Sequence, residues 1–309
     1  KLKVLWNSTK FRLEGAVFIG EVPVPMIRDA QHLSTAFKMD QERYPWNRSS
    51  IPSDRFYEDF DLHFTFLRQD TLYPLYYYYS LQAESAQRIT PDIYSGRIKP
   101  PAGPDQMEQL KNYLKKVVDY KRNKQKADQV LFFTGHGYNS EDPITWMDEK
   151  TAIRQQFDYL DGQQNFLEYL NFRDEDHVKY RLLSELKRDD LDIALLHHHG
   201  GPEAQYLDGM PEVRSIPDEI EDVKFYLRSK LRDAGDSEDK RKAVRENYMK
   251  TYGVPESWFD LTFDPEQIKK DSTFNADLDI YVEDLQYYSS SARFIMLDAC
   301  FTGSFHLYK

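Results

Sequence analysis

The chain has 309 residues, which is enough for one large domain or two modest ones with a sizeable buried core. Its formal net charge of −11 argues against nonspecific binding to nucleic acid or anionic lipid. We find no apolar run of about 18 residues and therefore expect no membrane span, and the single cysteine, Cys300, excludes an internal disulfide.

Short apolar runs predict strands in the first third of the chain. Residues 15–20 lie between two glycines and predict a buried strand that ends at the prolines at 23 and 25, because proline cannot donate to a ladder. Residues 27–55 are polar and irregular. Three further segments indicate strands: 59–65, 76–79 and 91–98. A packed loop is the alternative for the tyrosine run at 76–79.

Helices and strands alternate from residue 104 onward. Pro104 begins the clearest predicted helix, because apolar residues then recur at spacings of three and four and proline suits a first turn. The segments that follow are a strand at 128–134, a largely helical region at 151–188, a strand at 191–198, amphipathic helix at 217–250, a short strand at 278–281 and a buried strand into Cys300. This order predicts an α/β fold with a mainly parallel sheet, in which chemistry collects at the carboxyl ends of the strands.

Two of these strands end in side chains that could react together. The apolar run before Cys300 is matched, about a hundred residues upstream, by one that ends in His197, His198 and His199. A thiol at a strand tip can meet substrate, and it needs a neighbour to accept its proton. If the strands are neighbours, His199 is the preferred base, because the glycines after it leave room for substrate. A lone cysteine is also commonly a small core residue.

The histidines allow other interpretations. His197 and His199 would share one face of a strand and could bind zinc, although the rest of a zinc hydrolase set is not apparent. Hydrogen-bonded core histidines are the plainer alternative for one or two of the three. His136, between Gly135 and Gly137, is a rival base after its own strand, or it belongs to a structural turn.

Four motifs in chain order resemble the gingipain family of caspase-like cysteine peptidases. Val17–Val22 is similar to an early strand of that family, and Asp92–Ile98, followed by a helix, is similar to its strand ending in Gly-Arg. The strand that runs into His199-Gly200 and the strand Phe294–Cys300 are similar to its two catalytic strands.

This resemblance, over roughly 15–200 and 290–309, implies a fold and a division into domains. We expect a caspase-like αβα sandwich of three layers with a mainly parallel sheet. An N-terminal subdomain would span 1–125 and a catalytic subdomain 126–309, with a long helical insertion at about 210–275 before the cysteine strand. A caspase-like fold normally continues beyond the catalytic cysteine, so we expect this chain to be incomplete at its C-terminus.

The resemblance also implies the roles of individual residues. His199 and Cys300 would form the catalytic dyad of an endopeptidase, with backbone support from Gly200. The strand before His136 corresponds to one outside the dyad, and family members carry an acidic residue near that position. The chain departs from the family there, so the third catalytic residue stays open and His136 is kept as a supporting candidate.

In the same family, the loop after this strand helps to hold the basic side chain that precedes the cleaved bond. Here it contains Glu141, Asp142 and Asp148, whose carboxylates would favour Lys or Arg by charge-assisted hydrogen bonds. Solvated loop acids are the alternative. No cofactor is required, although related enzymes bind calcium, for which the sequence names no ligands.

The resemblance further implies protein or peptide substrates and a secreted or cell-surface bacterial enzyme. The final residue, Lys309, fits proteolytic processing after lysine, which would provide a second chain as a partner. The alternative is a catalytically inactive caspase-like fold that serves as a binding or assembly module. The departure at His136 favours that alternative, and the helical insertion would be its partner surface.

Overall fold

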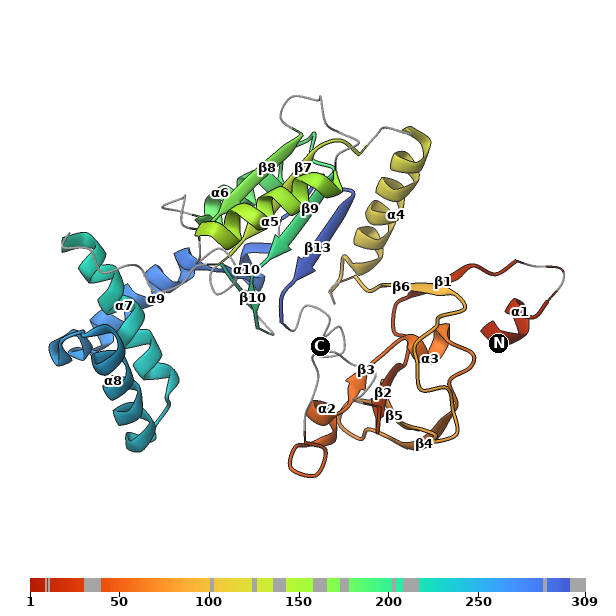
Figure 1. The fold of residues 1–309 in the computed structure, drawn as a ribbon, viewed down its shortest axis with the longest axis horizontal. Helices are drawn as coiled ribbons and strands as arrows, with labels where there is room; N and C mark the ends of the chain where they lie inside the picture. Colours follow the sequence, from red (N-terminus) through yellow and green to blue (C-terminus); the bar gives the residue numbers. More distant parts are fainter. Residues whose placement is uncertain are drawn as a thin grey trace. The chain divides into compact units, whose positions relative to one another are not determined.

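The computed structural model describes most of the chain as two compact units, 1–124 and 125–303, here called the N-terminal and C-terminal units. The described residues are 1–8, 10, 12–30, 40–100, 103–123, 127–135, 143–157, 166–172, 178–201, 204–207, 217–285 and 288–300. Figure 1 shows the elements of both units in sequence colours. The fold is mixed α/β, as the sequence predicts.

The N-terminal unit contains two sheets. One pairs β1 with β6 in parallel, and the other has the order β3-β2-β5-β4, with β2 and β5 parallel and the outer strands antiparallel to them. The strands are β1 (Gly15–Ile19), β2 (Val24–Arg28), β3 (Ile51–Pro52), β4 (Phe64–Gln69), β5 (Tyr76–Leu81) and β6 (Tyr94–Ile98). The helices of this unit are α1 (Leu2–Trp6), α2 (Trp46–Ser49), α3 (Arg55–Glu58) and α4 (Gln106–Asn123).

Several expectations for this unit need correction. β1 is only partly covered, and Val17 is 61% exposed, so this strand is not the buried one expected. The fully buried strand is β2, which contains Pro25 instead of ending there. Pro25 cannot donate to the ladder, but its carbonyl accepts from the Ser53 backbone N–H. The alternating segment at 59–65 becomes a strand only from Phe64 onward.

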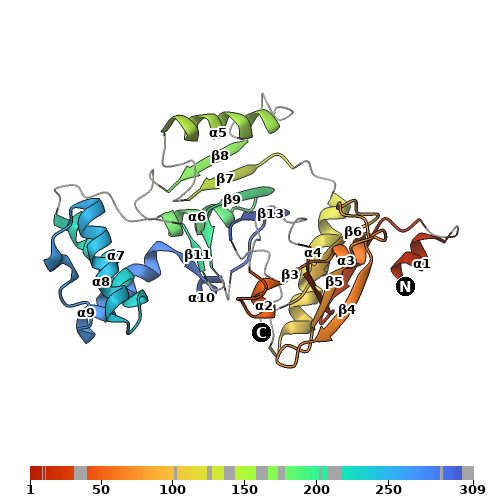
Figure 2. The ribbon, with the colours of Figure 1, turned by 60° about the horizontal axis from the view of Figure 1, so that its bottom comes forward.

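The central sheet of the C-terminal unit is parallel throughout and has the order β13-β9-β7-β8. Successive side chains of a strand point to opposite faces, and each face carries a helix. Lys150 and Arg154 of α5 lie over the Tyr169 and Phe166 rings. Figure 2 shows the helices α5 and α6 on opposite sides of this sheet. The elements are β7 (Val130–Thr134), α5 (Pro143–Gln156), β8 (Leu167–Asn171), α6 (Val178–Leu186), β9 (Ile193–His197) and β13 (Phe294–Asp298).

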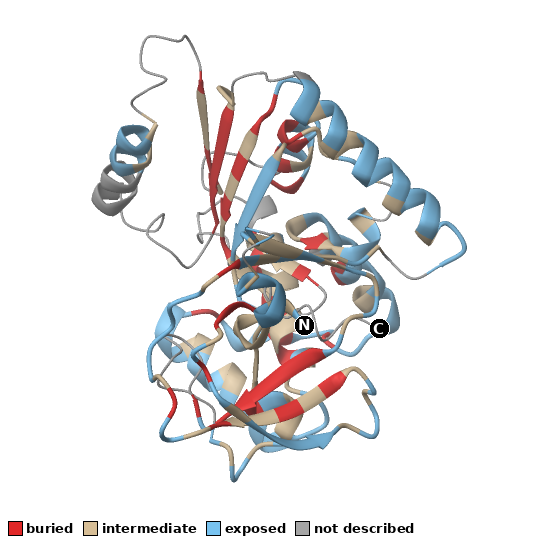
Figure 3. Cartoon of the chain, turned by 90° about the vertical axis from the view of Figure 1, so that its right-hand side faces the viewer, coloured by how far each residue is buried: buried red, intermediate tan, exposed pale blue. Residues whose placement is uncertain are grey.

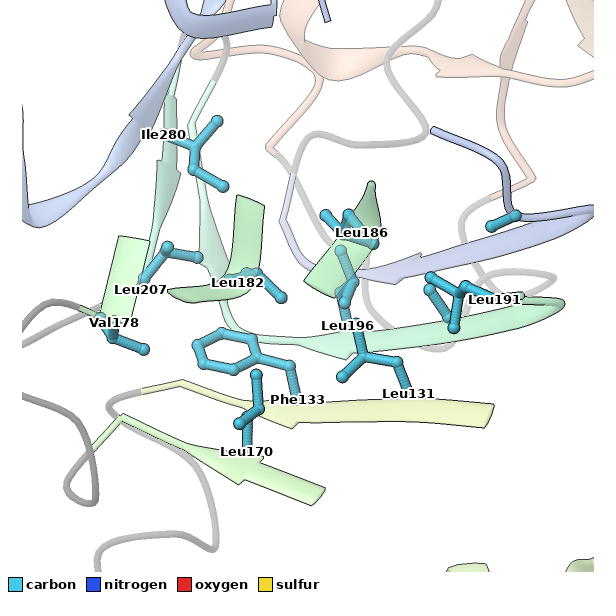
Figure 4. Close-up of a cluster of buried hydrophobic side chains, with 12 residues drawn as sticks. Leu131, Phe133, Leu170, Val178, Leu182, Leu186, Leu191, Leu196, Leu207 and Ile280 are labelled. Atoms are coloured by element: carbon cyan, nitrogen blue, oxygen red, sulfur yellow. The ribbon is translucent and has the colours of Figure 1, made fainter. Parts of the chain in front are cut away.

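The main core of this unit lies between α6 and the sheet. Figure 4 shows Leu182 and Leu186 of α6 above the side chains that β7, β8 and β9 contribute to this face. Ile280, from the small sheet described below, and Leu207, which directly follows one of its strands, extend the same cluster. Burying a side chain of this kind contributes about 2 kcal/mol, so this cluster is what fixes the strands that carry the candidate site.

Two expectations for the sheet are wrong. The region 151–188 is not largely helical, because β8 lies between α5 and α6 and pairs with β7. The strand before Cys300 is not buried: every residue of β13 is exposed, as its pale blue colour in Figure 3 shows. Among the described residues, β13 pairs only with β9 and stands at the edge of the sheet.

The helical insertion has a core of its own. Val223, Leu227 and Leu231 of α7 are fully buried against η4, and partly buried residues of α8 pack on them. The helices are α7 (Pro217–Asp233), α8 (Glu238–Tyr252), the 3-10 helix η4 (Glu256–Phe259) and α9 (Pro265–Leu278). α7 and α8 confirm the amphipathic prediction for 217–250, and η4 and α9 continue the insertion toward the short strand.

Two charged residues, Arg228 and Asp271, are buried within this insertion, and the partly buried Arg232 joins them. Asp271 of α9 is fully buried and accepts two hydrogen bonds from Arg228 at 2.9 and 3.0 Å and one from Arg232 at 2.8 Å. Burial opposes ionisation of Asp271, but the hydrogen bonds from Arg228, Gln267 and Arg232 outweigh it, and its pKa is lowered. This carboxylate therefore fastens α7 to α9.

A small antiparallel sheet, of order β10-β11-β12, joins the carboxyl end of β9 to the end of the insertion. Its strands are β10 (His199–Gly200), β11 (Ala204–Tyr206) and β12 (Ile280–Tyr281), and α10 (Val282–Leu285) follows them. Within the described ranges, no helix combines the length and apolar character that a membrane crossing needs.

Candidate active site

The strands that lead to Cys300 and His199 are neighbours. β13 pairs in parallel with β9, with Phe294 opposite Ile193 at one end and Asp298 opposite His197 at the other. Parallel strands present their carboxyl ends at the same edge of a sheet. Cys300 follows β13 by two residues and His199 follows β9 by two, so the two segments continue side by side beyond the paired strands.

Asp192 sets the register at the opposite end of these strands. Its buried carboxylate accepts hydrogen bonds from the Asp128 and Gln129 backbone N–H groups at 2.8 and 3.1 Å. It also forms an ion pair with Arg293, with 2.9 Å between Oδ1 and Nε. One side chain thus ties the starts of β7, β9 and β13 together, which fixes where each strand ends.

Contacts continue past the ends of the strands. The His198 backbone N–H donates to the Asp298 carbonyl at 3.2 Å, and the Gly135 N–H donates to the His197 carbonyl at 2.8 Å. A β-carbon added at Gly200 would overlap the carbonyl oxygen of Cys300 and would lie 3.2 Å from the Ala299 β-carbon. Gly200 is therefore packed directly on the backbone of the cysteine.

Glycine is also required on the other side of this segment. A β-carbon added at Gly135 would lie 2.8 Å from the β-carbon of His198 and 2.9 Å from the Leu207 carbonyl oxygen. These distances are too short for any side chain. The segment from His198 to Gly200 therefore lies between Gly135, which follows β7, and Cys300, which follows β13. One partner in each close contact is a glycine: Gly135 against His198, and Gly200 against Cys300.

The three consecutive histidines have three different environments. His197 is partly exposed, and its Nε2 lies 3.8 Å from the Asp298 carboxylate. His198 is completely buried, near the Phe133 ring in the main core. His199 is partly exposed in β10, opposite Tyr206 of β11. The burial pattern makes His198 the hydrogen-bonded core histidine that the sequence allowed as an alternative.

Burial decides the charge state of His198. Desolvation is the largest influence and lowers its pKa below the usual 6.5, and the neighbouring His197 and His199 act in the same direction. The hydrogen bond with the His199 carbonyl and the charge of Asp298 oppose that shift without reversing it. His198 is accordingly neutral at pH 7.

Cys300 itself is exposed at the edge of the sheet. An exposed thiol that directly follows a strand can meet solvent and reagents, in contrast to a thiol packed in a core. The arrangement therefore places the exposed Cys300 on the segment next to that of the partly exposed His199, with a glycine whose backbone touches the cysteine. This combination suits nucleophilic attack on a carbonyl, followed by proton transfer to a leaving group.

The described residues do not cover every predicted site residue. His136, Glu141, Asp142 and Lys309 lie outside them, and Asp148 falls within α5 with its side chain undescribed. Across the described part of the chain, no group of three His, Cys, Asp or Glu side chains is arranged to hold a metal ion. The segments at the carboxyl ends of β9 and β13 do bring Cys300, Gly200 and the three histidines to one edge of the sheet.

Sequence reasoning missed two residues that shape this region. The sequence pattern places Asp298 only within an apolar strand, yet its carboxylate lies beside His197 and its carbonyl accepts from the His198 backbone N–H. The pattern gives Asp192 no role beyond a place in a strand. An acidic residue inside or next to an apolar run is the signal that could have identified both, because a carboxylate is seldom placed there without a partner.

The sequence matches no known family model, and no similar protein was found among the curated proteins or the solved structures.

Proposed function

We propose that this chain is a cysteine endopeptidase that cleaves after Lys or Arg, with Cys300 as the nucleophile and His199 as the general base and acid. The observation that supports this most is the parallel pairing of β13 with β9, which brings the two segments to one edge of a sheet. The proposal includes a caspase-like sandwich as the fold and a bacterial cell surface or the extracellular space as the location, both from the motif resemblance.

The reaction would proceed in two halves. The Cys300 proton passes to His199 as sulfur forms a bond to the scissile carbonyl carbon, and the carbonyl oxygen becomes an oxyanion. The C–N bond then breaks, and the leaving amine takes the proton from His199. Water, deprotonated by His199, attacks the thioester in the second half, and the C–S bond breaks to release the acid and restore the thiol.

Backbone N–H groups are the natural donors to the oxyanion. Gly201 donates to the Ala204 carbonyl at 2.8 Å, and bonded positions alternate along an antiparallel pair. Gly200, one residue earlier, therefore falls at a position where its N–H points away from β11. Its close packing on Cys300 makes this N–H, with that of Cys300 itself, the proposed oxyanion donor pair. One such donor contributes about 3 kcal/mol to catalysis.

Peptide cleavage tests the proposal directly. We expect hydrolysis of peptide amides after Lys or Arg, and we expect Cys300→Ala and His199→Ala each to lower kcat/KM by at least about 10³-fold. His197→Asn is the matched control, because it removes a histidine two positions away that belongs to neither step. Full activity in either purified dyad variant would disprove the assignment.

Thiol labelling gives a second test that needs no substrate. Cys300 is the only cysteine in the chain, so iodoacetamide incorporation reports on this sulfur alone. A thiol primed by His199 should alkylate faster at neutral pH in wild type than in His199→Ala. Identical slow rates in both proteins would support the noncatalytic binding module instead.

A further inference from the structure

The buried ring of His198 is bonded to the backbone of the candidate base. Its Nδ1 lies 2.8 Å from the carbonyl oxygen of His199. A carbonyl oxygen only accepts, so Nδ1 must carry the hydrogen, and neutral His198 is therefore the Nδ1–H tautomer. Its Nε2 is then a lone-pair acceptor. That atom is buried and has no hydrogen-bond partner among the described residues.

Holding the His199 carbonyl also orients the Gly200 N–H. The peptide unit between these residues is planar, and in the trans form its C=O and N–H point in opposite directions. A His199 carbonyl that accepts from the His198 ring therefore turns the Gly200 N–H to the side opposite that bond. This is the same N–H that alternation along β10 and β11 leaves outside their ladder.

The ring of His198 cannot easily move out of this bond. It has no exposed surface, its β-carbon abuts Gly135, and its centroid lies 6.2 Å from that of Phe133. The backbone on its own side is fixed by the 3.2 Å hydrogen bond to the Asp298 carbonyl. A donor on a rigid ring orients a peptide more firmly than a donor on a flexible chain would.

We propose that His198 is a positioning residue, whose Nδ1–H holds the His199–Gly200 peptide so that the Gly200 N–H faces the reacting carbonyl. The proposal rests on the peptidase function proposed above and adds a residue that never touches the substrate. It also explains why a fully buried histidine directly precedes the candidate base, where an apolar residue would cost less to bury.

Three substitutions separate this role from simple packing. His198→Asn keeps an amide N–H near the position of Nδ1, His198→Gln moves that N–H toward the position of Nε2, and His198→Leu fills the space without a donor. We expect His198→Leu to lower kcat by about 10- to 100-fold with a smaller effect on KM, because a misaligned oxyanion donor is lost mainly in the transition state. His198→Asn should recover most of kcat, and His198→Gln should not.

Thermal unfolding of each variant shows whether it folds, and only folded variants are compared. Equal kcat values in folded His198→Leu and wild type would overturn the proposal. Equal losses in His198→Asn and His198→Leu would do the same, since bulk and packing would then explain both.

Two measurements remain decisive if the wild type cleaves no peptide and the peptidase function itself fails. Nitrogen-15 NMR of the histidine rings should show one pH-independent Nδ1–H tautomer that disappears in His198→Leu. Exchange of the Gly200 amide hydrogen should be faster in wild type than in His198→Leu, in which the peptide is free to turn inward. An Nε2–H tautomer at His198 would overturn the assignment whatever the activity.

Discussion

Gly200 packs directly on Cys300, with no room between its α-carbon and the cysteine carbonyl oxygen for even one additional methyl group. This contact joins the segment after β9 to the segment after β13, beyond the last paired residues, His197 and Asp298. The glycine therefore sets the separation between the candidate base and the candidate nucleophile.

Gly200→Ala should accordingly damage the site. The added β-carbon would overlap the Cys300 carbonyl and force one segment away from the other, which we expect to cost about 1–3 kcal/mol of stability. Iodoacetamide labelling of Cys300 and urea unfolding, followed by circular dichroism, would measure both effects. Gly96→Ala is the matched control, because a β-carbon there meets nothing within 4 Å. Unchanged labelling and stability in Gly200→Ala would show that this contact is not tight.

Asp192→Asn should loosen the opposite end of the same strands. The change leaves an amide oxygen that can still accept both backbone hydrogen bonds made by Oδ2, but it puts an NH2 group beside the Arg293 guanidinium and removes that buried ion pair, so we expect a loss of about 3 kcal/mol in the free energy of unfolding. Asp190→Asn is the control two residues away: its side chain is 60% exposed, and its ion pair with Arg188 should contribute less than about 1 kcal/mol. Urea unfolding compares the two, and equal losses would contradict the role given to Asp192.

The sequence predicts an element correctly where the element's own residues determine its structure, and it fails where distant residues do. β7 follows from Val130–Thr134, because an unbroken run of buried apolar residues has few other structures available. β8 was missed because Leu167–Asn171 mixes one acid with apolar residues and lies between helices, and only its pairing with β7 makes it a strand. The apolar run of β13 predicts a strand correctly but not its exposure, which depends on what covers the sheet and not on the run itself.

The sequence likewise predicts only part of the candidate site. The residue types and the strand ends predict that Cys300 and a histidine belong to one edge, and the pairing of β9 with β13 agrees with that arrangement. Alternation along the strand separates His198 from His197 and His199, but it does not say which of the two faces is buried. The burial of His198 depends on Phe133 and Gly135, which are more than sixty residues away in the sequence.

Asp271→Asn should unfold the helical insertion more readily. Two arginines would lose their shared buried carboxylate, and breaking such a pair typically costs about 3–5 kcal/mol. Glu266→Gln, an exposed position in the first turn of the same helix, should change stability by less than about 0.5 kcal/mol. Limited proteolysis of 217–278 would detect the difference. Equal cleavage rates in the two variants would indicate that the arginines find other acceptors.

Acid should also destabilise the helical insertion, because protonation of Asp271 removes the charge that pairs with the arginines. The pKa of Asp271 is lowered in the folded chain, so its stabilising contribution is complete above the ordinary value of 3.8 and is lost as the pH falls through the folded value. In Asp271→Asn this part of the acid sensitivity should be absent. Proteolysis at pH 3 with an acid-active protease would compare the variant with wild type, and equal acid sensitivity would contradict the assignment.

His198 should make the C-terminal unit less stable in mild acid. Its folded pKa lies below the ordinary 6.5, so the unfolded chain binds a proton first as the pH falls. Stability is therefore constant above that value and declines below it, by at most about 1.4 kcal/mol per pH unit, until the folded ring also protonates. His198→Asn cannot take up this proton and should flatten the decline between pH 7.5 and 5.5 in urea unfolding. His63→Asn, which removes an exposed histidine from the N-terminal unit, should retain the wild-type decline. If His198→Asn kept that decline as well, the assignment of the acid sensitivity to His198 would be wrong.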